Sequence, residues 1–422
     1  MIRTIALALA FAYAVNATAD PVLPREAAAN SALNAMCRAD RGRLWRTDLC
    51  GPLIVVDPAT RAVWASQADA DGVLVRGDGG WIGRLPQGVT VANTSVEWAG
   101  VRWIMVMGPL PDDEVEMRVL VAHEAWHRVQ AGIGLPAQGS ENAHLESENG
   151  RYLMRLELRA LRRAMASRGQ ARWNAAQDAL AFRAARLRAF EGAAAQEAAL
   201  DRNEGLASYT GVKLGAGRDA FAYAARTLAA YDHHNAFARS YAYASGPAYG
   251  LLLDQRREGW RAQLGADAPA DLLARVLGAD FTESALTEAS SRYDGLTLLA
   301  EERARAEAQA QRVAQLRARF SEGPRLVLPL SAVQMEFDPN QVSPVEGLGQ
   351  VYGVLTIRDV WGELRTTAGG LISADFTRLT LALPDPGGVS GPGWTLTLNP
   401  GFLVSAPDQS GVTTVRRGSG GE

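Results

Sequence analysis

The sequence predicts an α+β protein, because apolar residues alternate near both ends of the chain and follow a helical period between them. Short alternating runs separated by turn residues precede residue 111. Residues 112–323 are rich in alanine, arginine and leucine, with apolar positions three and four apart. After Pro324 the alternation returns, with glycine and proline between the runs. We therefore expect a β-rich part at 20–111, a helical domain at 112–323 and a C-terminal β domain at 324–422.

Residues 1–19 have the pattern of a secretory signal peptide. A basic start is followed by a short apolar run and the small residues Ala17, Thr18 and Ala19. The run is too short to span a bilayer, and no later run reaches the necessary length. We expect an exported bacterial protein, periplasmic or secreted. The use of arginine almost throughout, with Lys213 as the single lysine, is typical of a GC-rich genome.

Two short hairpins are expected before residue 111. Residues 53–56 and 62–65 flank an Asp-Pro turn, and residues 96–98 face 101–107 across Ala99-Gly100. Cys37 and Cys50, the two cysteines of the chain, are expected to form a disulfide in an oxidising compartment. The net charge of −3 and the pI of about 6.1 give no electrostatic basis for binding nucleic acid.

The run His-Glu-Ala-Trp-His at residues 123–127 is the strongest chemical signal. On a helix, His123 and His127 lie on one face and can bind one metal ion. Glu124 then lies beside that ion, where it can accept a proton from a bound water. Asp113 can cap this helix, and Glu116 at the third helical position completes a capping-box pattern. A Zn²⁺ site is therefore expected, with Trp126 buried in the core.

A catalytic zinc site needs a third protein ligand. The other histidines are His144, His233 and His234, and His144 is expected at the surface of a loop. A glutamate is therefore expected as the third ligand. Three candidates compete: Glu204, Glu146 and Glu157.

At this point the sequence resembles the gluzincin metallopeptidases of the aminopeptidase N type. The segment Asn-Glu-Gly-Leu-Ala-Ser-Tyr at 203–209 is similar to the one that carries the zinc-ligand glutamate in that family, which implies Glu204 as the ligand. The segment Tyr-Ala-Ser-Gly at 243–246 is similar to the family's Tyr-x-x-Gly, which implies that Tyr243 stabilises the oxyanion. The family's short spacing instead matches Glu146, so choosing Glu204 requires a helical insertion over residues 147–200.

The resemblance implies a zincin-like catalytic domain and a zinc metallopeptidase in which Glu124 is the general base. The family's Gly-x-Met-Glu-Asn segment is missing before Asp112, so a free amino terminus and an internal peptide bond both remain open as targets. Tyr243 can also be read as a core residue, because Tyr241 and Tyr249 share its apolar segment.

Two other functions compete with the peptidase. One is a degenerate zincin with a structural metal, which binds a partner through the C-terminal β domain. The other is a zinc hydrolase of a non-peptide substrate. That β domain contains no histidine or cysteine, and it is expected to be a small sandwich. A helix is expected before it at 296–320.

Overall fold

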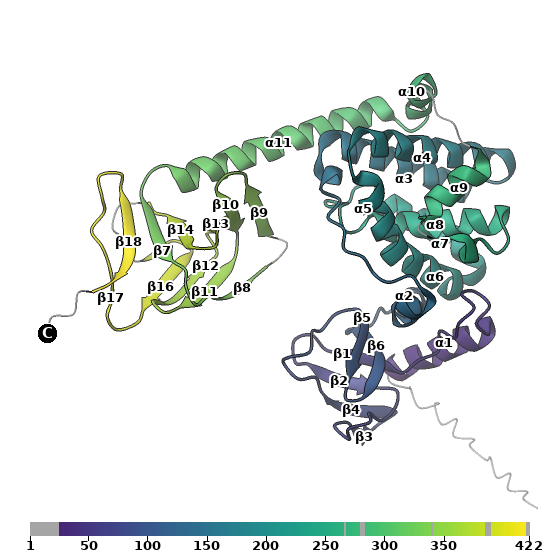
Figure 1. Cartoon of the computed structure of the whole chain (residues 1–422), viewed down its shortest axis with the longest axis horizontal. Helices are drawn as coiled ribbons and strands as arrows, with labels where there is room; N and C mark the ends of the chain where they lie inside the picture. The colour runs from purple at the N-terminus through teal and green to yellow at the C-terminus, as the bar shows by residue number, and fades with distance from the viewer. Residues whose placement is uncertain (1–24, 266, 279–282, 339–340, 385–389, 419–422) are drawn as a thin grey trace, which may run out of the picture. The chain divides into compact units, whose positions relative to one another are not determined.

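The computed structural model describes residues 25–265, 267–278, 283–338, 341–384 and 390–418. The expected signal peptide at 1–19 lies outside these residues. The α+β class is confirmed, with strands first, helices in the middle and strands at the end (Figure 1).

The chain divides into two compact units, Met1–Leu298 and Leu299–Glu422. The boundary falls inside α11 (Gly295–Ser321), the helix expected at 296–320.

The first unit begins with a helix and a six-stranded sheet of order β3-β4-β2-β1-β6-β5. Both expected hairpins are present as the antiparallel pairs β1–β2 and β5–β6, and β1 runs parallel to β6. The strands are β1 (Leu53–Val56), β2 (Ala62–Ala65), β3 (Val75–Gly77), β4 (Gly80–Arg84), β5 (Thr94–Trp98) and β6 (Val101–Met107).

Helices make up the rest of the first unit. The expected helical pair over 147–200 is present as α3 and α4, followed by the shorter α5. The helices are α1 (Arg25–Asp40), α2 (Glu114–Gln130), α3 (Glu148–Ala166), α4 (Gly169–Ala189), α5 (Ala193–Leu200), α6 (Leu206–Gly215), α7 (Ala220–Tyr231), α8 (Tyr241–Arg256), α9 (Pro269–Leu277) and α10 (Glu283–Ser291).

The two faces of the sheet bury different cores. On one face Leu53 and Val55 join the large core that the helices share. On the other, Ile54 and Val56 pack with Trp103 in a smaller core of the sheet itself. This alternation follows from the period-two geometry of a strand. Helix α2 lies between the sheet and α6, so its two sides meet different layers (Figure 1).

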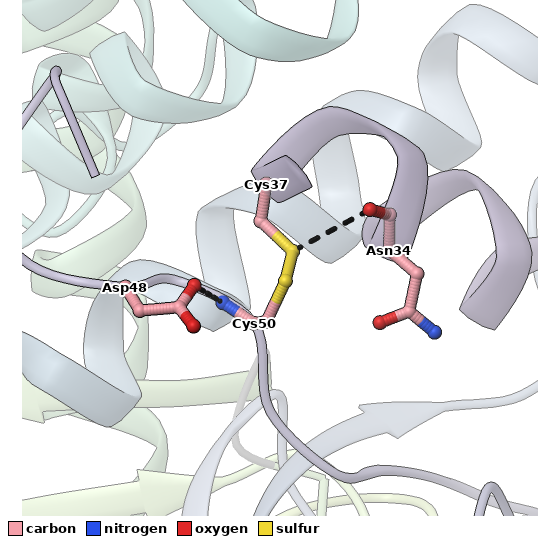
Figure 2. The surroundings of a disulfide bond; sticks show 4 residues. All are labelled: Asn34, Cys37, Asp48 and Cys50. Carbon is pink, nitrogen blue, oxygen red and sulfur yellow. Dashed lines mark hydrogen bonds between the residues drawn. A yellow bond between two sulfur atoms is a disulfide. The ribbon is translucent and has the colours of Figure 1, made fainter. Parts of the chain in front are cut away.

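The expected disulfide joins Cys37, near the end of α1, to Cys50, just before β1 (Figure 2). The carboxylate of Asp48 accepts a hydrogen bond from the Cys50 backbone nitrogen at 2.8 Å. The disulfide therefore ties the first helix to the start of the sheet that supports α2.

The second unit contains two sheets around a shared core. The core includes Leu328, Leu355, Trp361, Leu379 and Trp394. One sheet has the order β17-β18-β7-β14-β13-β10-β9 and the other β15-β16-β12-β11-β8, which is the expected sandwich.

The strands of this unit have the following bounds: β7 (Arg325–Pro329), β8 (Gln334–Phe337), β9 (Val342–Val345), β10 (Gly349–Tyr352), β11 (Leu355–Asp359), β12 (Gly362–Thr366), β13 (Gly370–Ser373), β14 (Arg378–Ala382), β15 (Ser390–Gly391), β16 (Trp394–Leu398), β17 (Phe402–Val404) and β18 (Val412–Arg417). Within the described parts of both units, no helix has the length and apolar character needed to cross a membrane.

Candidate metal centre

Helix α2 presents His123 and His127 on one face and buries the opposite face. Asp113 caps the helix as expected, accepting hydrogen bonds from the backbone nitrogens of Val115 and Glu116. Trp126 is fully buried in the core, also as expected. The capping-box expectation for the Glu116 side chain is wrong, because this carboxylate accepts a hydrogen bond from the Tyr223 hydroxyl instead.

Glu204 reaches the two histidines from a π-helical turn, Asp201–Gly205, that leads into α6. Such turns displace side chains from the regular helical positions and are frequent at functional sites. Close packing of α6 on α2 depends on Gly211, where a Cβ atom would lie 2.6 Å from the Val119 carbonyl oxygen. A Cβ atom at Gly246 of α8 would likewise lie 2.4 Å from the Gly205 Cα. Glycines therefore allow the three elements to meet.

The three ligand-type side chains form a compact triangle of atoms. The Nε2 atoms of His123 and His127 are 3.1 Å apart, and Glu204 Oε2 lies 3.3 Å from the first and 3.6 Å from the second. Tetrahedral ligands at normal zinc distances lie about 3.3–3.6 Å from one another. Two of the three edges fall in this range and the third is shorter by about 0.2 Å, so the donor set and its spacing fit Zn²⁺ after a small adjustment.

Burial and charge set the protonation of this triangle. Burial lowers the pKa of His123, so its ring favours the neutral form that binds metals. Burial also opposes ionisation of Glu204, but the two imidazoles 3.3 and 3.6 Å from its Oε2 atom outweigh it and hold the pKa of Glu204 well below its ordinary value. Glu204 is therefore a carboxylate, and its Oε2 atom is buried without a hydrogen-bond partner among the described residues.

Glu124 lies beside the triangle, with Oε1 3.9 Å from His123 Nε2. Its side chain is 3 % exposed, and burial raises its pKa to about 8, although the nearby His127 acts in the opposite direction. Its Oε2 atom also finds no hydrogen-bond partner in the described part of the chain. A buried carboxylate with an unpaired oxygen is costly, so its presence here indicates that the site has a partner to offer it.

Two amide side chains connect one ligand to another. Gln130 Oε1 lies 3.0 Å from His127 Nδ1, Gln130 Nε2 donates to Asn203 Oδ1 at 3.1 Å, and Asn203 Nδ2 donates to Glu204 Oε1 at 2.9 Å. This chain, the amide relay, requires His127 to carry its proton on Nδ1. It therefore leaves His127 Nε2 and Glu204 Oε2 as the atoms that face the triangle.

Neither Gln130 nor Asn203 was predicted as a functional residue. The spacing of Gln130 three residues after His127 on one helix face is the signal that could have found it. Ser208 was also missed. Its hydroxyl lies 3.3 Å from His123 Nδ1 and helps to orient this imidazole, although a hydroxyl can donate or accept and so does not select the tautomer.

Tyr243 differs from the other two tyrosines of α8. Tyr241 and Tyr249 are buried and donate to the Glu197 carbonyl and the Glu157 carboxylate, respectively. Tyr243 is 36 % exposed, and its ring stacks on His123 with centroids 5.5 Å apart. Burial and the charge of Glu204 raise the pKa of Tyr243, so it remains a phenol and a hydrogen-bond donor.

The structure does not bring the other candidate carboxylates to the triangle. Glu157 is fully buried, but its carboxylate binds Arg186 at 2.6 Å and Tyr249 at 2.7 Å. Glu146 lies 3.5 Å from the backbone nitrogen of Ala238.

The remaining histidines also lie elsewhere. The surface expectation for His144 is wrong, because its side chain is 8 % exposed and binds Glu197 at 2.8 Å. His233 is largely exposed, and His234 stacks on Tyr231.

A cavity of about 350 Å³ opens onto the triangle. Its lining includes His123, His127, Glu204, Glu124 and Tyr243. A second group of ligand-type side chains, Cys37, Asp48 and Cys50, is unavailable to a metal because its cysteines form the disulfide.

Comparisons with protein-family models, with curated proteins and with solved structures return no match. The kind of site is therefore inferred from the geometry of its residues.

Proposed function

We propose that the protein is an exported zinc-dependent metallopeptidase of the gluzincin type. The observation that carries the proposal is the triangle formed by His123, His127 and Glu204, whose edges of 3.1, 3.3 and 3.6 Å lie within about 0.2 Å of those expected for tetrahedral zinc. Three ligands leave one position open, as catalytic sites require. The disulfide between Cys37 and Cys50 is consistent with an oxidising compartment.

When bound, the zinc ion supplies a water of lowered pKa and polarises the substrate carbonyl. Glu124 acts as the general base. Its buried carboxylate accepts a proton from the attacking water and delivers it to the leaving amine. Glu124 is suited to this exchange because its Oε2 atom is buried beside the triangle and has no hydrogen-bond partner among the described residues.

Tyr243 is proposed to stabilise the oxyanion. Its phenol stays protonated and lines the cavity beside Glu124 and Glu204. A hydrogen bond that forms as charge develops on the carbonyl oxygen lowers the barrier by about 3–4 kcal/mol at comparable positions.

The cavity and Glu124 argue against a purely structural metal. Structural zinc sites are closed by four protein ligands and need no general base. The described ligand-type atoms around the triangle belong to three residues, and a buried carboxylate with an unpaired oxygen lies next to them. Two alternatives are a scaffold protein with a structural metal and a zinc hydrolase of a non-peptide substrate, and the same experiment distinguishes both from a peptidase.

The test compares Glu124→Gln with Glu114→Gln, an exposed glutamate at the start of the same helix. Both variants and the wild type are loaded with zinc and incubated with a peptide library, with and without a chelator. We expect all three to bind one zinc ion, and Glu124→Gln alone to lose at least about 100-fold in peptide cleavage. Stoichiometric zinc without cleavage of any peptide would favour the scaffold, or the non-peptide hydrolase if an ester or amidase substrate is turned over.

A further inference from the structure

The cavity at the metal centre continues along α2 towards the start of that helix. Its lining includes Glu116, Val119 and Leu120 in addition to His123 and His127. These positions share one helix face, because they are separated by three or four residues. Seven residues separate Glu116 from His123, which corresponds to about 10 Å along the helix axis.

The walls of this extension are mainly apolar. Val119 and Leu120 of α2, Val212 of α6 and Tyr231 of α7 line the cavity, together with the uncharged polar side chains of Asn93 and Thr227. Such walls favour the methylene groups of a long side chain. Between the histidines at one end and Glu116 at the other, these wall residues carry no charged side chain.

The far end of the extension presents a carboxylate. Tyr223 is 8 % exposed and donates its hydroxyl hydrogen bond to Glu116. Burial and the bonded carboxylate raise the pKa of Tyr223, so the phenol remains a donor. Among the described residues no ion pair of Glu116 is found, and the nearby Arg226 guanidinium lies over the Tyr223 ring, 5.6 Å from its centre. One oxygen of Glu116 is thus held by Tyr223, and the carboxylate remains available to a cation.

Resting on the proposed function, we infer that this extension binds a lysine or arginine side chain of the substrate next to the scissile bond. A lysine side chain spans about 6 Å from Cα to the ammonium group, and a hydrogen bond adds about 3 Å. A residue whose carbonyl lies at His123 and His127 can therefore reach Glu116. The aliphatic stem packs on Val119 and Leu120, and the cation pairs with the carboxylate.

The competing occupant is an uncharged aliphatic side chain, with Glu116 acting only as a favourable charge at a helix N-terminus. A peptide series distinguishes the two. Each residue flanking the scissile bond is varied among lysine, arginine, norleucine and glutamate, since norleucine keeps a long aliphatic stem without the charge. We expect kcat/KM for lysine or arginine to exceed that for norleucine at least about 10-fold at one flanking position.

Glu116→Gln is expected to remove this preference, so that the ratio of kcat/KM for the lysine peptide to that for the norleucine peptide falls to about 1. Glu114→Gln, the exposed control from the same helical turn, is expected to keep the preference. Tyr223→Phe is expected to reduce it in part, because the carboxylate loses its fixed orientation.

Binding gives a readout that does not depend on turnover. The zinc-loaded Glu124→Gln protein is titrated with uncleaved lysine and norleucine peptides, alone and combined with Glu116→Gln. A lower Kd for lysine that disappears with Glu116→Gln supports the inference. Equal values of Kd and kcat/KM for lysine and norleucine overturn it while leaving the peptidase proposal intact. A failure to cleave any peptide overturns the peptidase proposal, and the titration then decides the inference separately.

Discussion

Two buried clusters of histidine and carboxylate lie in the first unit, and they treat charge in opposite ways. In one, the ionic cluster of Glu157, Glu197, Arg183, Arg186 and His144, the carboxylates pair with guanidinium groups. In the other, the candidate metal centre, Glu204 and Glu124 each retain a buried oxygen without a hydrogen bond from the described residues. The ionic cluster also has buried nitrogens of Arg183 and Arg186 without a hydrogen bond, but guanidinium groups lie against its carboxylates, whereas none does so at the candidate metal centre among the described residues.

The two clusters show how a ligand-binding site differs from a buried ionic network that stabilises the fold. Glu197 and Glu204 are seven positions apart in the chain, and each contacts an imidazole. Arg186 binds both oxygens of Glu197 at 2.7 Å, whereas Glu204 has histidines and an amide as partners. A buried carboxylate is stabilised by a cation or by taking up a proton. The absence of a guanidinium or ammonium partner for Glu204 among the described residues supports the proposed metal.

The largest expected effect comes from removing the negative charge of Glu204 or of Glu197 by substitution with glutamine. Glu204→Gln removes a ligand and is expected to weaken zinc binding by more than about 100-fold, because loss of a supporting residue alone costs up to that amount. Glu197→Gln is expected to leave zinc affinity within a few-fold and to destabilise the fold instead. Competition with a chromophoric chelator measures both. Equal losses of affinity in the two variants would show that the clusters are not separate.

Removing a cation from the ionic cluster should unfold the first unit more readily. Arg186 is fully buried and binds both Glu157 and Glu197, so Arg186→Met leaves these two carboxylates to share Arg183 as a guanidinium partner. We expect a loss of about 3–5 kcal/mol in the free energy of unfolding. Glu124→Gln, which replaces a carboxyl group that burial already keeps largely protonated at neutral pH, is expected to leave the stability of the zinc-free protein nearly unchanged. Urea unfolding followed by near-ultraviolet circular dichroism compares the two, and equal destabilisation would contradict the distinction.

The amide relay is expected to have a smaller effect on the metal centre. Gln130→Ala leaves His127 Nδ1 without its acceptor and Asn203 without its donor. Zinc affinity should fall about 10- to 100-fold, and the cobalt-substituted protein should show an altered visible spectrum. Gln170→Ala, at an exposed glutamine of α4, is the matched control. An unchanged zinc affinity and visible spectrum in Gln130→Ala would show that the amide relay does not support metal binding.

The sequence predicted those features that depend on local pattern. The hairpins, the Asp113 cap and the burial of Trp126 follow from period, capping chemistry and side-chain type, and all are present. The proximity of Glu204 to the histidines could not be derived this way, because only the packing of α6 on α2 creates it. Local pattern alone left Glu157 as a rival, and its partner Arg186 belongs to another helix.

Two errors have the same physical cause. His144 was expected at the surface because its segment looks like a loop, but a distant carboxylate, Glu197, holds its ring inside the fold. Glu116 was expected to complete a local capping box, but it binds Tyr223 of another helix. Polar side chains that find partners across the core are not visible in a local pattern.

The stability that the ionic cluster contributes is expected to depend on pH. Burial opposes ionisation of Glu197, but Arg186 and Arg183 outweigh it and hold its pKa well below the ordinary value. A carboxylate whose pKa is lower in the folded state adds stability above its unfolded pKa, near 4.5, and this contribution is lost as the pH falls. The melting temperature of the zinc-free protein should therefore fall on acidification below about pH 4.5. Glu197→Gln should lower the melting temperature at pH 7 and flatten its pH dependence. A wild-type slope retained in full by this variant would assign the acid sensitivity to other carboxylates.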